Sequence, residues 1–354
     1  MTEELMQEKL GIAIAGMGEM GMVRAVIAKG LPDYELVCVI DPRGTFARLA
    51  GKQLGVSHYS SYEKAASSQK FDALIISTPL GSHYELGMKA VRDRKHVLCE
   101  KPLAGNSSHA IEMHREATKY GVKTQVGYNW RFHVTFRRAK EILEKGALGE
   151  LKYVRLMVYK SEVTKPEEKS EKKNREERFG FYGALAVHGL DLLLWFAGKP
   201  NSLCAQTTRV FSSELSDLIS AVCRFDNGVH GVIDLGWSHH GFVDKDDLSI
   251  YLTGTTGSMN VNSDCIETYL EKACEGLPCG DSITYAAEIP YHTEFWFTHR
   301  GLSHEMEAFA RAVLQGAHTS PSWYDGYLVD RFVETLEESG RSRKTIAPVI
   351  EESE

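Results

Sequence analysis

Short apolar runs alternate with amphipathic stretches along the first 127 residues of the chain. The apolar runs have the length of buried strands, and they lie at residues 12–15, 36–40, 71–77, 96–99 and 123–127. Helical stretches separate them, at about residues 22–29, which Gly30 can cap, at 83–94, and from Ser107 or Ser108 to Gly121. Strands that alternate with helices through short connections predict a doubly wound parallel sheet.

The pattern changes after residue 127. Strand-like runs now follow one another with few helices between them, as in an antiparallel meander. They lie at residues 151–159, 216–225, 229–235, 248–252 and 258–261, and helices are expected at about 135–145, 182–195, 302–315 and 324–338. We therefore predict an α/β protein of two domains. Residues 1–127 form the doubly wound domain, and residues 128–354 form an α+β domain built on an open, mainly antiparallel sheet.

Composition limits the classes of function. Hydrophobic residues make up 43% of the 354 residues and charged residues 25%, as in soluble globular proteins. The net charge of -7 gives no basic face for nucleic acid, and no apolar run has membrane-spanning length, so we expect a cytoplasmic protein. Seven cysteines without a CxxC pair favour reduced thiols, and the histidines lack a recognised ligand spacing, so we expect no metal.

A glycine fingerprint, GMGEMG at residues 16–21, lies between the first expected strand and the first helix. This is the GxGxxG turn of a dinucleotide-binding Rossmann domain. Gly16 makes the tight turn, Gly18 lets a pyrophosphate approach the backbone, and Gly21 lets the helix pack closely. The helix N-terminus then offers N–H groups to the anion. The expected cofactor contacts in this turn are Gly16, Met17, Gly18, Glu19, Met20 and Gly21.

Asp41 ends the second apolar run, about 20 residues after the fingerprint. A carboxylate at this place binds the adenosine ribose of NAD and repels the 2′-phosphate of NADP. Arg43 lies two residues further on, and an arginine there can pair with that phosphate. We predict NAD as the cofactor, with NADP as an alternative and with Asp41 and Arg43 as cofactor contacts.

A lysine follows the expected strand at residues 96–99, in the sequence Glu100-Lys101-Pro102. Ligands of open α/β sheets bind outside the carboxyl ends of the strands, so the Lys101 ammonium would lie beside the cofactor. A solvated surface charge is the alternative interpretation. Glu100 and Lys101 are expected cofactor contacts. The others are Ser77, Thr78 and Pro79, where the run at residues 71–77 ends, and His83, where the next helix begins.

His188 is the second candidate for catalysis. It lies in an apolar stretch, residues 182–195, that predicts a buried helix with His188 and Asp191 one turn apart. Oxidation of an alcohol by NAD needs a base near pH 7, and imidazole titrates there. A histidine that only fills the core is the alternative.

Several motifs together resemble the glucose-fructose oxidoreductase / inositol dehydrogenase / rhizopine catabolism (Gfo/Idh/MocA) family. They are the glycine fingerprint, Thr78-Pro79 with His83, Glu100-Lys101-Pro102, residues 126–132 (VGYNWRF), the turns at 146–149 and 254–257, and His188 with Asp191. The resemblance implies a Rossmann domain, an open-sheet domain that mediates homo-oligomer assembly, and NAD(P)-linked oxidation or reduction of sugars, polyols or their derivatives. It also implies that Lys101 is the site lysine and His188 the acid/base, with Tyr128, Asn129 and Arg131 near nicotinamide or substrate.

The chain departs from this family at one position. Many members carry an aspartate one helical turn before the histidine, where this chain has Ala184 and Leu185. Either the substrate lies differently, or Tyr182, Asp191 or the segment at residues 160–178 supplies the polar group. That segment is rich in lysine and glutamate and predicts a solvated loop, with a lid as the alternative.

Three functions follow from these features. The leading hypothesis is an NAD(P)-dependent dehydrogenase or reductase of a sugar or cyclitol hydroxyl, working as a dimer or tetramer. The missing aspartate motivates a second one, in which transient oxidation assists glycoside cleavage or elimination without net redox. A non-catalytic NAD-binding sensor is the third, and the presence of both Lys101 and His188 argues against it.

Overall fold

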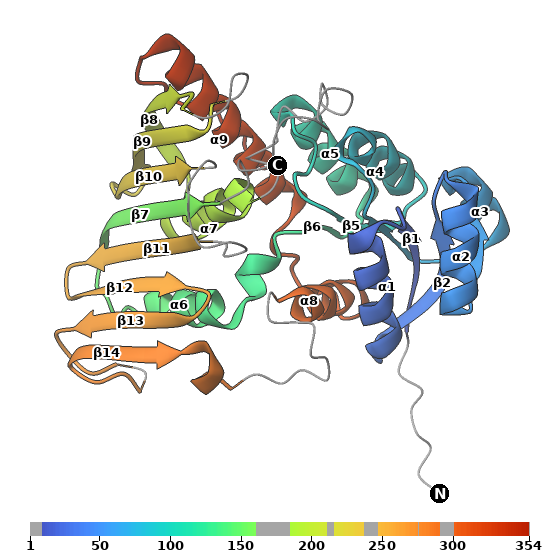
Figure 1. Cartoon of the computed structure of the whole chain (residues 1–354), viewed down its shortest axis with the longest axis horizontal. Coiled ribbons are helices and arrows are strands. Elements are labelled where there is room, and N and C mark those ends of the chain that lie inside the picture. The colour runs from blue at the N-terminus through green and yellow to red at the C-terminus, as the bar shows by residue number, and fades with distance from the viewer. Residues whose placement is uncertain are drawn as a thin grey trace, which may run out of the picture. The chain divides into compact units, whose positions relative to one another are not determined.

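The structure is a computed structural model of the chain, and it describes residues 9–160, 185–210, 216–236, 247–274, 276–290 and 301–353. It divides into two compact units, and Figure 1 labels most of their helices and strands. Unit 1 comprises Met1–Asn129, Thr293–Tyr327 and Glu352–Glu354, and unit 2 comprises Trp130–His292 and Leu328–Glu351. The described residues 301–327 therefore group with the amino-terminal unit, whereas the division made from the sequence placed them in the second domain.

The sheet of unit 1 has six parallel strands in the order β3-β2-β1-β4-β5-β6. They are β1 (Leu10–Ala15), β2 (Tyr34–Ile40), β3 (Ser57–Tyr59), β4 (Ala73–Ile76), β5 (His96–Cys99) and β6 (Thr124–Val126). The chain winds outward from β1 in one direction and from β4 in the other, so the order reverses between these two strands. This confirms the predicted doubly wound sheet. Ligands of such sheets bind beyond the carboxyl ends at the point of reversal.

Helices connect these strands, and the caps of two of them differ from the sequence-based expectation. They are α1 (Glu19–Gly30), α2 (Gly44–Leu54), α3 (Tyr62–Ser68), α4 (His83–Arg92) and α5 (Ser107–Tyr120), with a 3-10 turn, η1 (Leu80–Ser82), before α4. Helix α1 includes Gly30 and is capped by Leu31. Helix α5 is capped by Asn106, whose side chain accepts a hydrogen bond from the His109 N–H, rather than by a serine. Gly121 ends α5 in the left-handed conformation, as predicted.

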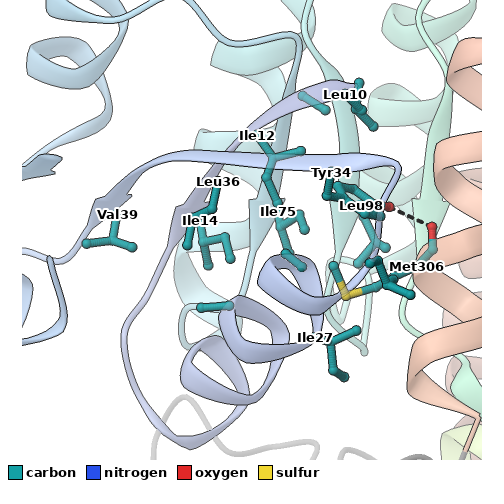
Figure 2. Close-up of a cluster of buried hydrophobic side chains, with 14 of the residues drawn as sticks. Leu10, Ile12, Ile14, Ile27, Tyr34, Leu36, Val39, Ile75, Leu98 and Met306 are labelled. Atoms are coloured by element: carbon teal, nitrogen blue, oxygen red, sulfur yellow. Dashed lines mark hydrogen bonds between the residues drawn. The ribbon is translucent and has the colours of Figure 1, made fainter. Parts of the chain in front are cut away.

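Helix α8 (Leu302–Leu314) completes the core of unit 1. Figure 2 shows Ile14 and Ile75 of the sheet gathered with Ile27 of α1 and Met306 of α8. The hydroxyl of Tyr34 donates a hydrogen bond of 2.6 Å to the Met306 carbonyl, drawn as a dashed line. The apolar face of α8 is thus buried against β1 and α1, which explains why this late segment belongs to unit 1.

Unit 2 is built on a sheet of eight strands in the order β14-β13-β12-β11-β7-β10-β9-β8. They are β7 (Leu151–Tyr159), β8 (Pro200–Thr208), β9 (Leu218–Phe225), β10 (His230–Gly236), β11 (Asp247–Gly254), β12 (Gly257–Asn262), β13 (Cys265–Leu270) and β14 (Gly280–Tyr285). All neighbours are antiparallel except β7 and β10, which are parallel. The predicted mainly antiparallel sheet is confirmed, although β8, β13 and β14 were not foreseen.

Helices cover one face of this sheet (Figure 1). Helix α7 (Val187–Ala197) contacts β7 and β11, and α6 (Val134–Glu144), which follows the 3-10 turn η2 (Asn129–Phe132), contacts β12 and β13. Another 3-10 turn, η4 (Ala286–Glu288), follows β14. The long helix α9 (Trp323–Ser342) reaches β8, where Ser339 Oγ accepts a hydrogen bond from the Ala205 N–H.

Candidate active site

The glycine turn between β1 and α1 is closed toward the protein and open on one side. A Cβ on Gly16 would lie 2.4 Å from the Ser77 carbonyl oxygen, and a Cβ on Gly21 only 1.8 Å from that of Gly16. Gly16 also has a φ of +88°, which favours glycine. A Cβ on Gly18 would meet nothing within 4 Å. The open position lies at the uncapped N-terminus of α1, where a pyrophosphate would be held.

Asp41 directly follows β2, and its carboxylate is hydrogen-bonded to this turn. Its Oδ2 accepts a hydrogen bond of 2.9 Å from the Met17 N–H, and its Oδ1 accepts one of 2.9 Å from the Arg43 N–H. The Arg43 guanidinium adds hydrogen bonds of 3.0 and 2.9 Å. Burial alone would raise the pKa of the Asp41 carboxyl, but these hydrogen bonds outweigh it and hold the pKa below its usual value. Asp41 is therefore anionic at neutral pH.

Ser77, Thr78 and Pro79 follow β4, beside the glycine turn. The Ser77 N–H donates to the Ala15 carbonyl at 2.8 Å, which keeps Ser77 against the end of β1. Its Oγ is buried and has no hydrogen-bond partner among the described residues. An unsatisfied buried hydroxyl costs about 1–3 kcal/mol, which a ligand that hydrogen-bonds to it would relieve. The open Gly18 and this hydroxyl together fit a bound dinucleotide.

Glu100 and Lys101 follow β5 at the same edge of the sheet. Glu100 is 8% exposed and accepts a hydrogen bond of 2.7 Å from Nε of Arg24, which is fully buried on α1. Nη2 of Arg24 also lies 2.8 Å from Oε2 of Glu305 on α8. Lys101 is half-buried. The carboxylate of Glu100 thus faces the protein interior, whereas Lys101 retains access to solvent.

His83, expected to contact the cofactor, is 1% exposed and instead contacts the backbone of unit 1. Its Nε2 lies 2.8 Å from the Thr78 carbonyl oxygen, and its Nδ1 lies 3.0 Å from that of Pro102. The ring therefore bridges the segments that follow β4 and β5.

Tyr128 and Asn129, two expected substrate contacts, follow β6 and are 0% and 7% exposed. The preceding residue, Gly127, lies against the Arg24 and Glu100 side chains, each of which would be 3.1 Å from a Cβ at that position. Tyr128 and Asn129 therefore leave the sheet at the same carboxyl edge as Lys101.

Arg131 and Asp191 form a buried, two-pronged ion pair within unit 2. Nε and Nη2 of Arg131 lie 2.8 and 2.6 Å from the two carboxylate oxygens of Asp191. The side chains are 5% and 0% exposed. The sequence suggested Arg131 as a substrate contact and Asp191 as one replacement for the absent aspartate. In the structure each is bound to the other, and the pair ties η2 to α7.

His188 lies one turn before Asp191 on α7 and is 5% exposed. Its ring centroid is 6.3 Å from that of Trp130. The histidine is therefore well buried in its helix, as the apolar sequence predicted. The expectations for Tyr182, Ala184 and the charged segment fall on residues 161–184, which lie outside the described part of the chain.

Neither a metal site nor a membrane span is found in the part of the chain that the structure describes. No three His, Cys, Asp or Glu side chains there are grouped so that they could hold a metal ion. No helix there is both long and apolar enough to cross a membrane.

Sequence reasoning missed the buried network formed by Arg24, Glu100 and Glu305. Arg24 carried a local signal, because it falls on the face of α1 that otherwise buries small and apolar residues such as Ala25 and Ala28. A charge on such a face needs a buried partner. Glu305 carried the same kind of signal, since it falls on the buried and otherwise largely apolar face of α8, but the sequence did not identify the partner of either charge.

Comparisons with known proteins agree with these features. The model described as "Oxidoreductase family, NAD-binding Rossmann fold" matches residues 10–128, and that of the "GFO/IDH/MocA C-terminal domain" matches residues 136–260. Myo-inositol 2-dehydrogenase of Thermotoga maritima is 26% identical over 63% of this chain and 67% of its own. D-xylose 1-dehydrogenase (NADP(+)) 2 of Haloferax volcanii is 24% identical over 94% of this chain and 96% of its own.

A solved structure shows the same fold. Levoglucosan dehydrogenase in complex with NADH and levoglucosan superposes with a TM-score of 0.84 at 20% identity, covering 96% of this chain and 100% of that one. The resemblance inferred from the motifs is confirmed, because both domain models match in the expected order. The chain belongs to the Gfo/Idh/MocA family of NAD(P)-dependent oxidoreductases and carries an NAD-binding Rossmann domain at its amino-terminal end.

Proposed function

We propose that the protein transfers a hydride between NAD and a hydroxyl-bearing carbon of a sugar, a cyclitol or a derivative of these. The observation that carries this proposal is the carboxyl edge of the unit 1 sheet, where the open turn at Gly18, the Ser77 hydroxyl and Lys101 follow the adjacent strands β1, β4 and β5. The names of relatives, which include inositol, xylose and levoglucosan dehydrogenases, support the substrate class. The free cysteines of the structure are in line with a cytoplasmic location.

Lys101 and His188 are the two residues proposed to act on the reacting hydroxyl group, one on its charge and the other on its proton. Nicotinamide, when bound, supplies the carbon that accepts the hydride. The Lys101 ammonium stabilises negative charge on the reacting oxygen, and His188 accepts the hydroxyl proton as a general base. Tyr128, Asn129 and Tyr182 are the proposed substrate contacts. Arg131 is proposed to act on substrate binding while paired with Asp191.

A panel of sugars and polyols with NAD tests the proposed reaction, and Lys101→Met tests the site. We expect NADH formation from at least one compound, and a loss of roughly 100-fold or more in turnover in the variant, because the ammonium that stabilises the oxyanion is gone. Lys95→Met is the matched control, since Lys95 is also half-buried but precedes β5 and binds the Phe71 carbonyl.

Three results would contradict this reading of the site. Bond cleavage without formation of NADH would indicate transient oxidation, and binding of NAD without any reaction would indicate a sensor. Equal losses of turnover in Lys101→Met and Lys95→Met would show that Lys101 has no specific role in the site.

His188→Ala should lower turnover by roughly 10²- to 10⁴-fold, the usual contribution of a positioned general base. The dissociation constant of NAD should stay nearly unchanged, because the glycine turn and Asp41 lie in the other unit. Turnover and melting temperature are measured on the same sample. A variant with a lower melting temperature but unchanged turnover would show that His188 only contributes to the packing around α7.

The cofactor preference depends on Asp41 and Arg43. The anionic carboxylate beside the glycine turn would accept ribose hydroxyls and repel a 2′-phosphate. Arg43 partly offsets this repulsion of the 2′-phosphate. Its side chain is 55% exposed, and its guanidinium carbon lies 4.1 Å from the centre of the Phe46 ring. By turning away from Asp41 it can reach a phosphate, and one relative is named as NADP-dependent.

We expect NAD to bind at least about tenfold more tightly than NADP, and Asp41→Ser to reduce or reverse this preference because the repelling charge is removed. Fluorescence titration with both reduced cofactors measures the ratio. Asp72→Asn is the control, since Asp72 also accepts a backbone N–H, that of Gly11, but at the opposite end of β1. Tighter binding of NADP by the wild type would refute the assignment.

We also propose a homo-oligomer formed through the uncovered face of the unit 2 sheet. Large apolar side chains are exposed on four strands of this sheet, and they are Val222, Tyr251, Tyr269, Ile283 and Tyr285. Strand register places Tyr251 in one cross-strand row with Asn260, Glu267 and Ile283. Exposed apolar side chains on a contiguous sheet face are typical of an interface.

Light scattering at micromolar concentration should give the mass of a dimer or tetramer. The double variant Tyr251→Asp/Ile283→Asp should be a monomer, because it buries two charges in the proposed interface. Val349→Asp is the control, since Val349 is 72% exposed and lies outside the strands. A wild-type monomer would rule out the assembly.

A further inference from the structure

The imidazole of His83 is enclosed by three backbone carbonyl groups. His83 is the first residue of α4 and is 1% exposed. Its Nε2 lies 2.8 Å from the carbonyl oxygen of Thr78, and its Nδ1 lies 3.0 and 3.2 Å from those of Pro102 and Leu103. Thr78 follows β4, and Pro102 and Leu103 follow Lys101. One ring therefore connects two segments at the carboxyl edge of the sheet.

All of the hydrogen-bonding capacity of this ring is directed at the protein. A neutral imidazole donates from one nitrogen only, so it satisfies either Thr78 or the two carbonyls after Lys101, and an imidazolium satisfies both sides. In either form neither ring nitrogen faces a ligand. This differs from the direct cofactor contact expected from the sequence, and it calls for another role.

The backbone on both sides of Lys101 is fixed. On the amino-terminal side, the Glu100 carboxylate is held by Arg24 at 2.7 Å, and the Glu100 N–H donates to the Ile76 carbonyl at 2.9 Å. On the other side, Leu103 is 0% exposed and packs so closely on Gly326 that a Cβ there would lie 2.7 Å from the leucine Cδ2. The contacts of His83 with the Pro102 and Leu103 carbonyl groups act on this same carboxyl-terminal side of Lys101.

We propose that His83 is a positioning residue, which fixes the main chain at Lys101 relative to the cofactor segment at Thr78 and Pro79. This inference rests on the function proposed above, in which the Lys101 ammonium acts on the reacting oxygen. A misplacement of about 1 Å in a reacting group can cost roughly 100-fold in rate, so a clamp on the backbone of the lysine matters even without touching the substrate.

We call the contacts of His83 with Thr78 on one side and with Pro102 and Leu103 on the other the His83 clamp. Three substitutions test its two sides separately. His83→Asn places an amide nitrogen near the position of Nδ1 and keeps a donor for Pro102 and Leu103. His83→Gln reaches the position of Nε2 and keeps a donor for Thr78, and His83→Leu keeps neither. His96→Asn is the matched control, because the half-buried His96 accepts the Lys123 N–H through its Nδ1 at the amino end of β5.

We expect His83→Leu to lower kcat by roughly 100-fold with less than about a threefold change in KM and in the dissociation constant of NADH. His83→Asn should recover about tenfold of this loss, and His83→Gln less, because only the asparagine holds the segment after Lys101. His96→Asn should lower the melting temperature with little change in kcat. Recovery by glutamine but not by asparagine, or a loss confined to KM, would overturn the proposal. Should His83→Leu not fold, the two amide variants decide the question.

A double-mutant cycle with Lys101→Met shows whether His83 acts through the lysine. If it does, His83→Leu has almost no further effect on kcat once the ammonium is gone. If the two losses multiply, His83 acts independently of Lys101, and the proposal is wrong.

Hydrogen exchange keeps the clamp testable if the proposed function fails. In NAD-bound protein, His83→Leu should speed amide exchange in residues 101–106 by about tenfold or more, whereas His96→Asn should leave it unchanged. Absence of dehydrogenase activity with this change present would reject the function and retain the clamp. Unchanged exchange in His83→Leu would reject the clamp, whatever the activity.

Discussion

The buried ion cluster of Arg24, Glu100 and Glu305 holds together the part of the protein on which the site depends. The guanidinium of Arg24 is removed from water, and its contacts with the two carboxylates are 2.7 and 2.8 Å long. Burial alone would lower the pKa of Arg24, but the two carboxylates outweigh it and raise the pKa. Loss of one partner of a buried ion pair costs about 3–5 kcal/mol, so the three segments are bound to one arrangement. These segments are the helix after the glycine turn, the end of β5 and α8.

This cluster explains how a parallel sheet can present several groups to one ligand. Helix α1 fixes the glycine turn, and the end of β5 fixes the residue next to Lys101. Arg24 joins these two segments through its contact with Glu100. Gly127 lies close to this cluster, since a Cβ there would be 3.1 Å from both the Arg24 and the Glu100 side chains. The residues proposed to act on ligands thus follow the strand ends, whereas the buried charges of the Arg24 cluster hold these segments in place.

What the sequence predicted well was local. Apolar runs gave β5 and β7 with their correct bounds, and the glycine turn and Asp41 lie together as their spacing indicated. The edge strand β14 was missed because Asp281, Ile283 and Tyr285 remain exposed while Ser282 and Thr284 are only partly buried, so no apolar run marks it.

Features that depend on distant contacts could not be predicted. His83 was assigned to the cofactor because of its motif, but two of the three carbonyl groups around it belong to residues 19 and 20 positions later in the chain. Arg131 and Asp191 were treated as separate candidates for the substrate, although 60 residues of chain fold back to pair them. No periodicity in a sequence reports such pairings, because they are decided by the packing of whole elements.

The membership of α8 in the amino-terminal unit has a consequence for how the protein is made. Gln125 and Glu305 are 180 residues apart in the chain, yet the amide of Gln125 donates to the Glu305 carbonyl in the interior of unit 1. As the chain leaves the ribosome, Arg24 and Glu100 are therefore present long before the second carboxylate and the apolar face of α8 arrive. The nucleotide-binding unit must wait for nearly the whole of unit 2 to be synthesised before its interior can close, and a recombination event that exchanged only the later half of the chain would also exchange part of that interior.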